Sequence, residues 1–143
     1  MLEIHNPLLW TGNAMEIREP RPLFTAGIAA VVDVAYEEPP APLPRQFIYC
    51  RFPINDGGGN DSSILLHAVQ CVFDFLVSDT RTIVACSAGM SRSPTIAAFA
   101  LAAYLDQSPE DVVSRIAVTQ ALELTGPLWD DVTRVFPRIR RLK

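Results

Sequence analysis

Short runs of hydrophobic and β-branched residues predict three β-strands. They are Ala29 to Ala35, Gln46 to Phe52 and Thr82 to Cys86, and a weaker fourth lies near Leu8 to Thr11. Residues of this kind suit the pleated, partly buried surface of a sheet. The stretch from Arg81 to Cys86 is the most apolar, so we expect it to be the central strand.

Later segments show the periodicity of helices. They run from Asp61 to Ser78, from Ser93 to about Leu105, from Ser108 onwards, and over roughly Leu128 to Phe136 after Gly126-Pro127. Asp61 or a neighbouring serine is placed to cap the first of these helices. Pro94 suits the first turn of the second, where its missing N–H costs nothing. The second helix has apolar residues on all of its faces and is expected to be buried.

Strands come first in the chain and helices dominate its end. The simplest architecture is an α/β fold, a short mixed central sheet flanked by helices, with the functional site at the carboxyl end of the central strand. The length of 143 residues suffices for one hydrophobic core. We therefore expect a single domain over residues 1–143.

Composition and charge limit the classes of partner that this protein is expected to bind. The net charge is −4, with 49% hydrophobic and 20% charged residues, which is typical of a globular protein and argues against a nucleic-acid binder. The terminal basic cluster of Arg138, Arg140, Arg141 and Lys143 reads as a solvated helix end. The longest apolar run, Ile96 to Leu105, has about half the length that a helix needs to span a bilayer. We expect no membrane partner.

The three cysteines lack zinc-like spacing and are odd in number, which favours a reducing compartment such as the cytoplasm over a disulfide framework or a metal site. Cys50 and Cys71 read as small buried hydrophobes, with a redox pairing to Cys86 as the less favoured alternative. We expect neither a metal nor a cofactor.

The segment from Thr82 to Pro94 combines a hydrophobic strand, a loop of small residues and a helix start. Such a loop turns successive backbone N–H groups inward around an anion, toward which the positive end of the helix dipole also points. The expected phosphate-binding residues are Ser87, Ala88, Gly89, Met90, Ser91 and Arg92. Cys86 is placed to act as a thiolate nucleophile. Arg92 offers a planar fork for two phosphate oxygens.

This segment, Cys86-Ser-Ala-Gly-Met-Ser-Arg-Ser-Pro94, resembles the phosphate-binding loop of the dual-specificity branch of the protein tyrosine phosphatases. Trp10 to Asn13 and Gly27 to Val34 are similar, less specifically, to that family's opening strand, short helix and second strand. The resemblance implies a metal-independent hydrolase that cleaves phosphotyrosine, with phosphoserine and phosphothreonine as further substrates, through a phosphocysteine intermediate. Its substrate would be a phosphorylated protein or a small phosphomonoester.

The resemblance also implies a general acid about thirty residues before the cysteine, and 86 − 56 = 30 points to Asp56. Asp61 is the competing candidate, although it reads as a helix cap. Asp56 is favoured because it precedes three glycines that allow a loop to carry an acid into place. In the family, the hydroxyl at the position of Ser93 assists the departure of the cysteine sulfur; a helix cap is its ordinary alternative.

One departure from the family pattern is Ala85, because the residue before the nucleophile is nearly always His there. Neither His5 nor His67 replaces it by position. A phosphate-binding pseudophosphatase with weak or no turnover is therefore the alternative function. Sulfur transfer or arsenate reduction is disfavoured by Ser93-Pro94 and by the position of Asp56. Lipid substrates are less favoured because the loop carries no Lys.

Overall fold

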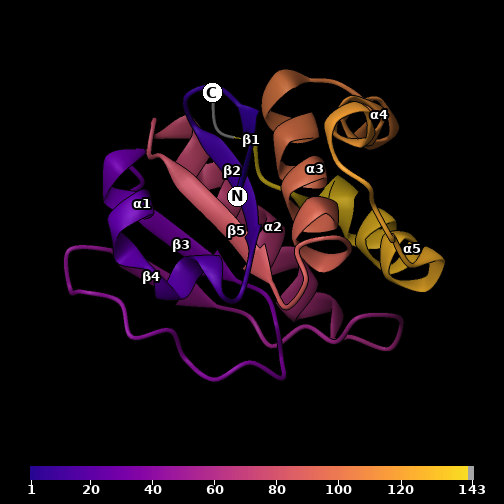
Figure 1. Ribbon diagram of the computed structural model, residues 1–143. Coiled ribbons are helices and arrows are strands. Elements are labelled where there is room, and N and C mark those ends of the chain that lie inside the picture. Colours follow the sequence, from indigo (N-terminus) through magenta and orange to yellow (C-terminus); the bar gives the residue numbers. More distant parts are fainter. Residues whose placement is uncertain (142–143) are drawn as a thin grey trace.

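The computed structural model describes residues 1–141, so Lys143 of the terminal basic cluster lies outside the described residues. Its strands form one five-stranded sheet in the order β1-β2-β5-β3-β4 (Figure 1). The strands are β1 (Leu2–His5), β2 (Leu9–Asn13), β3 (Ala30–Asp33), β4 (Ile48–Arg51) and β5 (Thr82–Cys86). β1 runs antiparallel to β2, and the other neighbours are parallel. The predicted mixed sheet is confirmed.

Strand β5 lies at the centre of the sheet, as its continuous apolar sequence predicts, because every one of its residues is buried. Its observed bounds are those predicted. The other three predicted strands are also present, with ends that differ by a few residues. β1 was not predicted, since its four residues are short of a clear pattern and none of them is fully buried. It pairs at the sheet edge and adds the antiparallel element.

The four helices predicted from periodicity are present with small shifts at their ends: α2 (Ser62–Val77), α3 (Arg92–Leu105), α4 (Pro109–Thr119) and α5 (Gly126–Val135). The chain also contains three shorter helices that periodicity did not predict: η1 (Glu16–Arg18), α1 (Pro20–Thr25) and η2 (Phe136–Arg138). The Asp61 carboxylate accepts a 2.7 Å hydrogen bond from the backbone N–H of Ser63, which confirms it as the cap of α2. Helix α3 begins at Arg92, one residue before the predicted start. Within residues 1–141 no helix has both the length and the apolar character to cross a bilayer.

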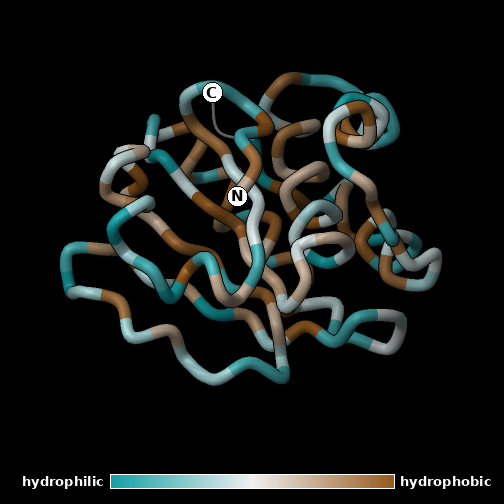
Figure 2. Tube along the Cα trace, viewed as in Figure 1, coloured by the Kyte–Doolittle hydropathy of each residue, from teal (hydrophilic) through white to brown (hydrophobic). Residues whose placement is uncertain are grey.

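Alternation along the strands divides the core between the two faces of the sheet. Val84 and Cys86 point into the larger core, which is shared with α2, α3, α4 and α5. Ile83 and Ala85 point into a smaller core on the opposite face, where Leu23 of α1 also packs. In Figure 2 the hydrophobic colour follows the central strands, whereas the outer loops are mostly hydrophilic. Adjacent residues of β5 therefore serve different cores.

Candidate active site

The loop of residues 87–91 connects the carboxyl end of β5 to the amino end of α3. Its carbonyl groups are bound from outside: Ser87 O by the Ala14 N–H (3.4 Å), Gly89 O by the Gln120 side-chain amide (2.8 Å), Met90 O by the Glu123 N–H (2.9 Å) and Ser91 O by the Thr95 hydroxyl (2.8 Å). Because these carbonyl groups have partners elsewhere and the loop precedes the amino end of α3, the loop is a candidate anion cradle.

Gly89 is required at its position by the backbone. Its φ is +78°, which L side chains rarely adopt, and a Cβ there would lie 3.1 Å from the carbonyl oxygen of Gly12 and 3.2 Å from its carbonyl carbon. The loop thus rests closely against the end of β2. A glycine allows both the turn and this approach.

Cys86 lies at the bottom of the loop with 3% of its surface exposed. The Gly89 N–H donates to Sγ over 3.2 Å, and the Cys86 thiol donates to Oγ of Ser93 over 3.3 Å. The Ser93 hydroxyl in turn donates weakly to the Gly12 carbonyl, over 3.4 Å. Ser93 lies inside α3, whose cap residue is Ser91, so the alternative in which Ser93 caps the helix is wrong. Its hydroxyl is instead in contact with the sulfur.

Arg92 is the first residue of α3 and is 4% exposed, so its buried charge must be stabilised by groups within the protein. Its Nη1 and Nη2 donate to the two carboxylate oxygens of Glu37, over 2.6 and 2.7 Å, and Nη1 also donates to the Ile54 carbonyl over 2.9 Å. The hydrogen bonds from Arg92 lower the pKa of Glu37 to about 2, and the same pairing raises the pKa of Arg92. Both groups remain charged across the neutral range.

Asp56 reaches the loop directly, since its Oδ1 accepts a 2.7 Å hydrogen bond from the Ser91 hydroxyl. Asn60 ties the glycine-containing turn together: its amide donates to the Asn55 carbonyl (2.9 Å) and the Gly57 carbonyl (3.1 Å). The Gly59 N–H also donates to the Asp131 carboxylate over 3.2 Å. Hydrogen bonds to Gly57 and Gly59 therefore hold the glycine turn in place. Of the two acid candidates, Asp56 contacts the loop and Asp61 caps α2.

The remaining candidates lie elsewhere. His5 packs edge-on against Tyr104, and His67 is exposed with its Nδ1 at 2.7 Å from the Ser63 carbonyl. Burial, with the neighbouring Cys50 thiol, raises the pKa of Cys71 to about 12. Cys50 and Cys71 are thus neighbours of each other, and both are only partly buried.

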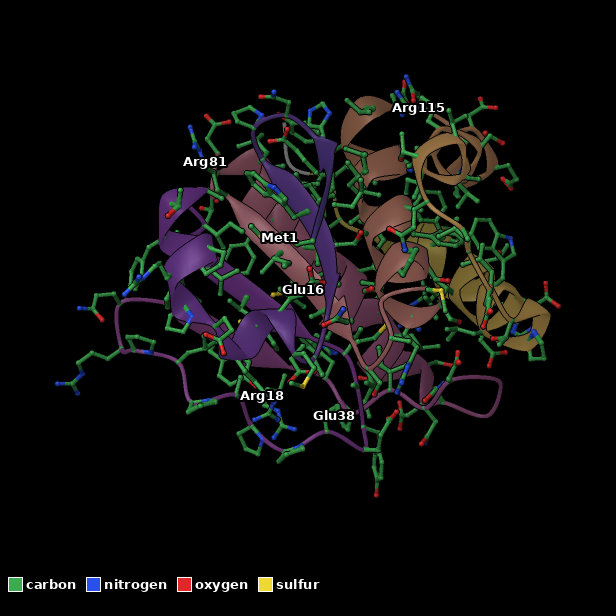
Figure 3. All side chains as sticks on the ribbon, viewed as in Figure 1. Met1, Glu16, Arg18, Glu38, Arg81 and Arg115 are labelled. Atoms are coloured by element: carbon green, nitrogen blue, oxygen red, sulfur yellow. The ribbon has the colours of Figure 1, made fainter. Side chains whose placement is uncertain are left out.

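Sequence reasoning missed Glu37, Glu38 and Gln120. The Ser87 hydroxyl donates to carboxylate oxygens of Glu37 (2.6 Å) and Glu38 (2.9 Å), so two acidic residues lie beside the loop. Figure 3 shows Glu38 at the edge of the molecule opposite Arg81, the residue before β5. A signal was available: both glutamates follow a predicted strand, and parallel strands bring their carboxyl ends to one edge. Gln120 follows a helix end and had no such signal.

Comparisons with known proteins support the fold. No family model matches the sequence, and no curated protein matches it. Among solved structures, human DUSP28 is similar with a TM-score of 0.84 and 17% identity, covering 96% of each chain. A mouse putative dual specificity phosphatase has a TM-score of 0.81 and 21% identity over 95% of this chain and 86% of that one.

Two further structures widen the comparison. DUSP15 has a TM-score of 0.78 and 18% identity, over 95% of this chain and 86% of that one. A human tyrosine phosphatase-like serine/threonine/tyrosine-interacting protein has a TM-score of 0.82 and 16% identity, covering 96% of each chain. These likenesses show that the chain has the fold seen in these dual-specificity phosphatase structures.

Proposed function

We propose that this protein is a cysteine-dependent phosphatase that hydrolyses phosphotyrosine, with phosphoserine and phosphothreonine as further candidate substrates. The observation that carries the proposal is the contact of Cys86 Sγ with the Gly89 N–H and the Ser93 hydroxyl, in a loop that ends at the buried cation Arg92. Nucleophile, anion cradle and cation are thus joined within one short segment. A reducing compartment such as the cytoplasm suits a free catalytic thiol.

In the first step, the Cys86 thiolate attacks phosphorus, a P–S bond forms, and the P–O bond to the leaving group breaks. Asp56 gives its proton to the departing oxygen, which leaves as an alcohol or phenol. Backbone N–H groups and Arg92 stabilise the charge on the transferring phosphoryl oxygens. The product of this step is a phosphocysteine.

In the second step, water attacks the phosphocysteine and passes a proton to the Asp56 carboxylate. The P–S bond breaks and the sulfur leaves as a thiolate, while phosphate is released. The Ser93 hydroxyl is in reach of the sulfur and, by rotating away from the Gly12 carbonyl, donates a hydrogen bond to the thiolate. This hydrogen bond stabilises the leaving sulfur.

The charges around the loop favour a protein or small monoester over a phosphoinositide. Ser87, Ala88, Met90 and Ser91 are uncharged, and the carboxylates of Glu37 and Glu38 lie beside the loop. Extra ring phosphates would meet these carboxylates without a lysine to bind them. PTPMT1, of the same fold with a TM-score of 0.74 and 15% identity, is known in complex with PI(5)P. A phosphoinositide is therefore a comparison substrate for assays.

A phosphate-binding role with weak turnover is the alternative, and Ala85 is the observation that favours it. A neighbour of this fold is itself named as a phosphatase-like interacting protein. Against this alternative, Ser93 contacts the sulfur and Asp56 contacts Ser91. The proposed mechanism uses both residues, whereas phosphate binding alone would need neither. We therefore favour catalysis.

The test is hydrolysis of an aryl phosphate in the presence of a metal chelator. The wild-type protein is expected to turn over, and Cys86→Ser is expected to lose turnover while still binding inorganic phosphate, because the cradle is made by backbone amides and Arg92. Residual hydrolysis by Cys86→Ser near the wild-type rate would exclude the covalent mechanism. Phosphate binding by a wild-type protein that shows no turnover would establish the binding role.

A further inference from the structure

Two hollows adjoin the loop of the candidate active site. The first has a volume of about 290 Å³, and Ala88 and Gly89 of the loop form part of its wall. The second has a volume of about 410 Å³ and shares Met1, Asn13 and Glu16 with the first. The two hollows therefore form one groove, which begins at the loop and passes the end of β2 toward the start of α1. We call it the flanking groove.

The size and position of the flanking groove suit a residue next to a phosphorylated one. Sites for small molecules typically measure about 300–1,000 Å³, so each hollow has room for a side chain rather than for a large cofactor. Ala88 and Gly89 belong both to the loop and to the groove, so a peptide whose phosphate is bound in the loop can place a neighbouring residue there. A simple aryl phosphate has no such residue.

A buried hydroxyl in the wall of the first hollow lacks a partner. Thr11 lines this hollow and is 1% exposed, and its Oγ1 makes no hydrogen bond within the described residues. Buried polar side-chain atoms nearly always have a partner, so an unpaired one points to a group that completes it. Thr11 therefore marks the first hollow as a place for a polar group.

The ionisable side chains that line the flanking groove are acidic. They are Glu16, in both hollows, and Glu19, in the second; within the part of the chain that the structure describes, no arginine, histidine or lysine side chain lines either hollow. Glu16 is held at the end of β2, because its Oε1 accepts the Asn13 N–H over 2.9 Å. Its Oε2 pairs with the amino group of Met1 (Figure 3). A carboxylate has about four acceptor sites, so Glu16 can accept further donors.

An exposed hydrophobic side chain completes the match to a long cationic one. Met15 lines the second hollow and is 72% exposed. Arginine and lysine lay their aliphatic stems on apolar surface and keep the charged end in a polar one. Glu19 is exposed and has no ion pair within residues 1–141, so it is available to that end. Arg18, which precedes it, donates instead to the Pro39 carbonyl over 2.9 Å.

We propose that the flanking groove is a specificity subsite, which binds an arginine or lysine side chain close to the phosphorylated residue of a phosphoprotein. The inference rests on the proposed function and deepens it, because it selects phosphorylated proteins over small phosphomonoesters. Glu16 and Glu19 meet the charge, Met15 contacts the stem, and Thr11 meets a polar group of the same peptide. The same carboxylates repel an acidic residue or a second phosphate, which adds to the selectivity.

The test compares phosphotyrosine heptapeptides that differ in one residue. Each of the two residues on either side of the phosphotyrosine is, in turn, Arg, Ala or Glu. An exposed ion pair changes an affinity by up to about fivefold, and two carboxylates line the groove, so kcat/KM for the Arg peptide should exceed that for the Glu peptide by about 5- to 25-fold at one or more positions. Equal values for Arg, Ala and Glu at all four positions would overturn the inference.

The double variant Glu16→Gln/Glu19→Gln tests whether the preference comes from this groove. It should abolish the difference between the Arg and Glu peptides, whereas phenyl phosphate, which has no residue for the groove, reports on the loop alone and should be hydrolysed as by the wild type. Asp79→Asn/Glu110→Gln is the matched control, because both residues are exposed, neither lines the groove, and the change in net charge is the same. A preference that survives in the first double variant, or that falls equally in the control, would overturn the inference.

The variant Thr11→Val separates a binding role from a structural one. Valine has nearly the same shape but no hydroxyl, and replacing an unpaired buried hydroxyl in this way is close to neutral or stabilising. The melting temperature should therefore not fall, while kcat/KM for the preferred phosphopeptide should fall severalfold. Wild-type kinetics with that peptide would overturn the placement of the peptide in the first hollow.

Binding measurements separate this inference from the proposed function. If the wild-type protein binds the Arg peptide more tightly than the Glu peptide in calorimetry but hydrolyses neither, the proposed hydrolysis is wrong and the subsite is supported. Hydrolysis of all the peptides with equal kcat/KM contradicts the subsite alone. A protein that neither binds nor hydrolyses any of them contradicts both.

Discussion

The Ser91 hydroxyl donates a 2.7 Å hydrogen bond to Oδ1 of Asp56, 35 residues away in the chain. This contact joins the loop that we propose binds phosphate to the turn that carries the proposed acid. Ser91 is also the cap residue of α3 and is largely buried, so its position is fixed by the helix. Asp56 is thereby held beside the loop of residues 87–91.

From this contact, we predict that Asp56→Asn slows substrates with poor leaving groups much more than activated ones. The amide cannot supply a proton, and general acid catalysis contributes about 10²- to 10⁴-fold. The rate for an unactivated phenyl or alkyl phosphate should fall within this range, while that for a strongly activated aryl phosphate should change little. Steady-state kinetics on a series of aryl phosphates checks the prediction.

Asp61→Asn is the control for that experiment. Because Asn also caps helices well, the variant should lose little stability and keep the wild-type dependence on leaving group. A leaving-group effect in Asp61→Asn, and none in Asp56→Asn, would assign the acid to Asp61.

For the loop itself, we predict that Gly89→Ala both destabilises the protein and weakens phosphate binding. The positive φ disfavours an L residue by more than about 1 kcal/mol, and the new Cβ would be 3.1 Å from the Gly12 carbonyl oxygen. Gly126→Ala is a matched control, since a Cβ at Gly126 meets no heavy atom within 4 Å. Urea unfolding and phosphate titration of the two variants should differ clearly, and equal behaviour would contradict the strain argument.

At Ala85, we predict that the substitution Ala85→His, which installs the residue expected there from the resemblance, destabilises this protein. Ala85 has no exposed surface and packs in the smaller core, on the face of β5 opposite Cys86. Overfilling a packed core costs about 1–3 kcal/mol, so the melting temperature of Ala85→His should fall by several degrees. Ala29→His, at an exposed position, is the control. A fully stable Ala85→His protein with higher activity would show that the core has room for the imidazole.

The ion pair of Glu37 with Arg92 predicts a specific acid sensitivity. Hydrogen bonds from Arg92 lower the pKa of Glu37 from 4.5 to about 2, so the folded state binds fewer protons than the unfolded state between these values. The stability from this carboxylate is present above about pH 4.5 and is lost as the pH falls toward 2. The difference in urea midpoint between wild type and Glu37→Gln should therefore shrink from pH 6 to pH 3. A constant difference would contradict the lowered pKa.

The sequence alone determined the features that are local in the chain. The strand of residues 82–86, the small-residue loop and the helix start were predictable because each has its own signature: continuous apolar residues, glycine, and proline in a first helical turn. Cys86 and Arg92 lie at the two ends of that loop, so their neighbourhood follows from spacing. The Asp61 cap was predictable for the same reason, since the carboxylate binds a backbone N–H two residues away.

Only the tertiary structure decided which distant side chains meet at the loop. Glu37 binds Arg92 because β3 is the neighbour of β5 in the sheet, and strand order leaves no periodic trace in a sequence. The contact of Asp56 with Ser91 likewise depends on how the turn after β4 folds back, where polar residues have no hydrophobic pattern to reveal their partners. Ala85 is the clearest case. That an alanine stands where a histidine was expected was visible in the sequence. That this alanine packs in the core on the face of the sheet opposite Cys86 became known only from the sheet and the layers that cover its two faces.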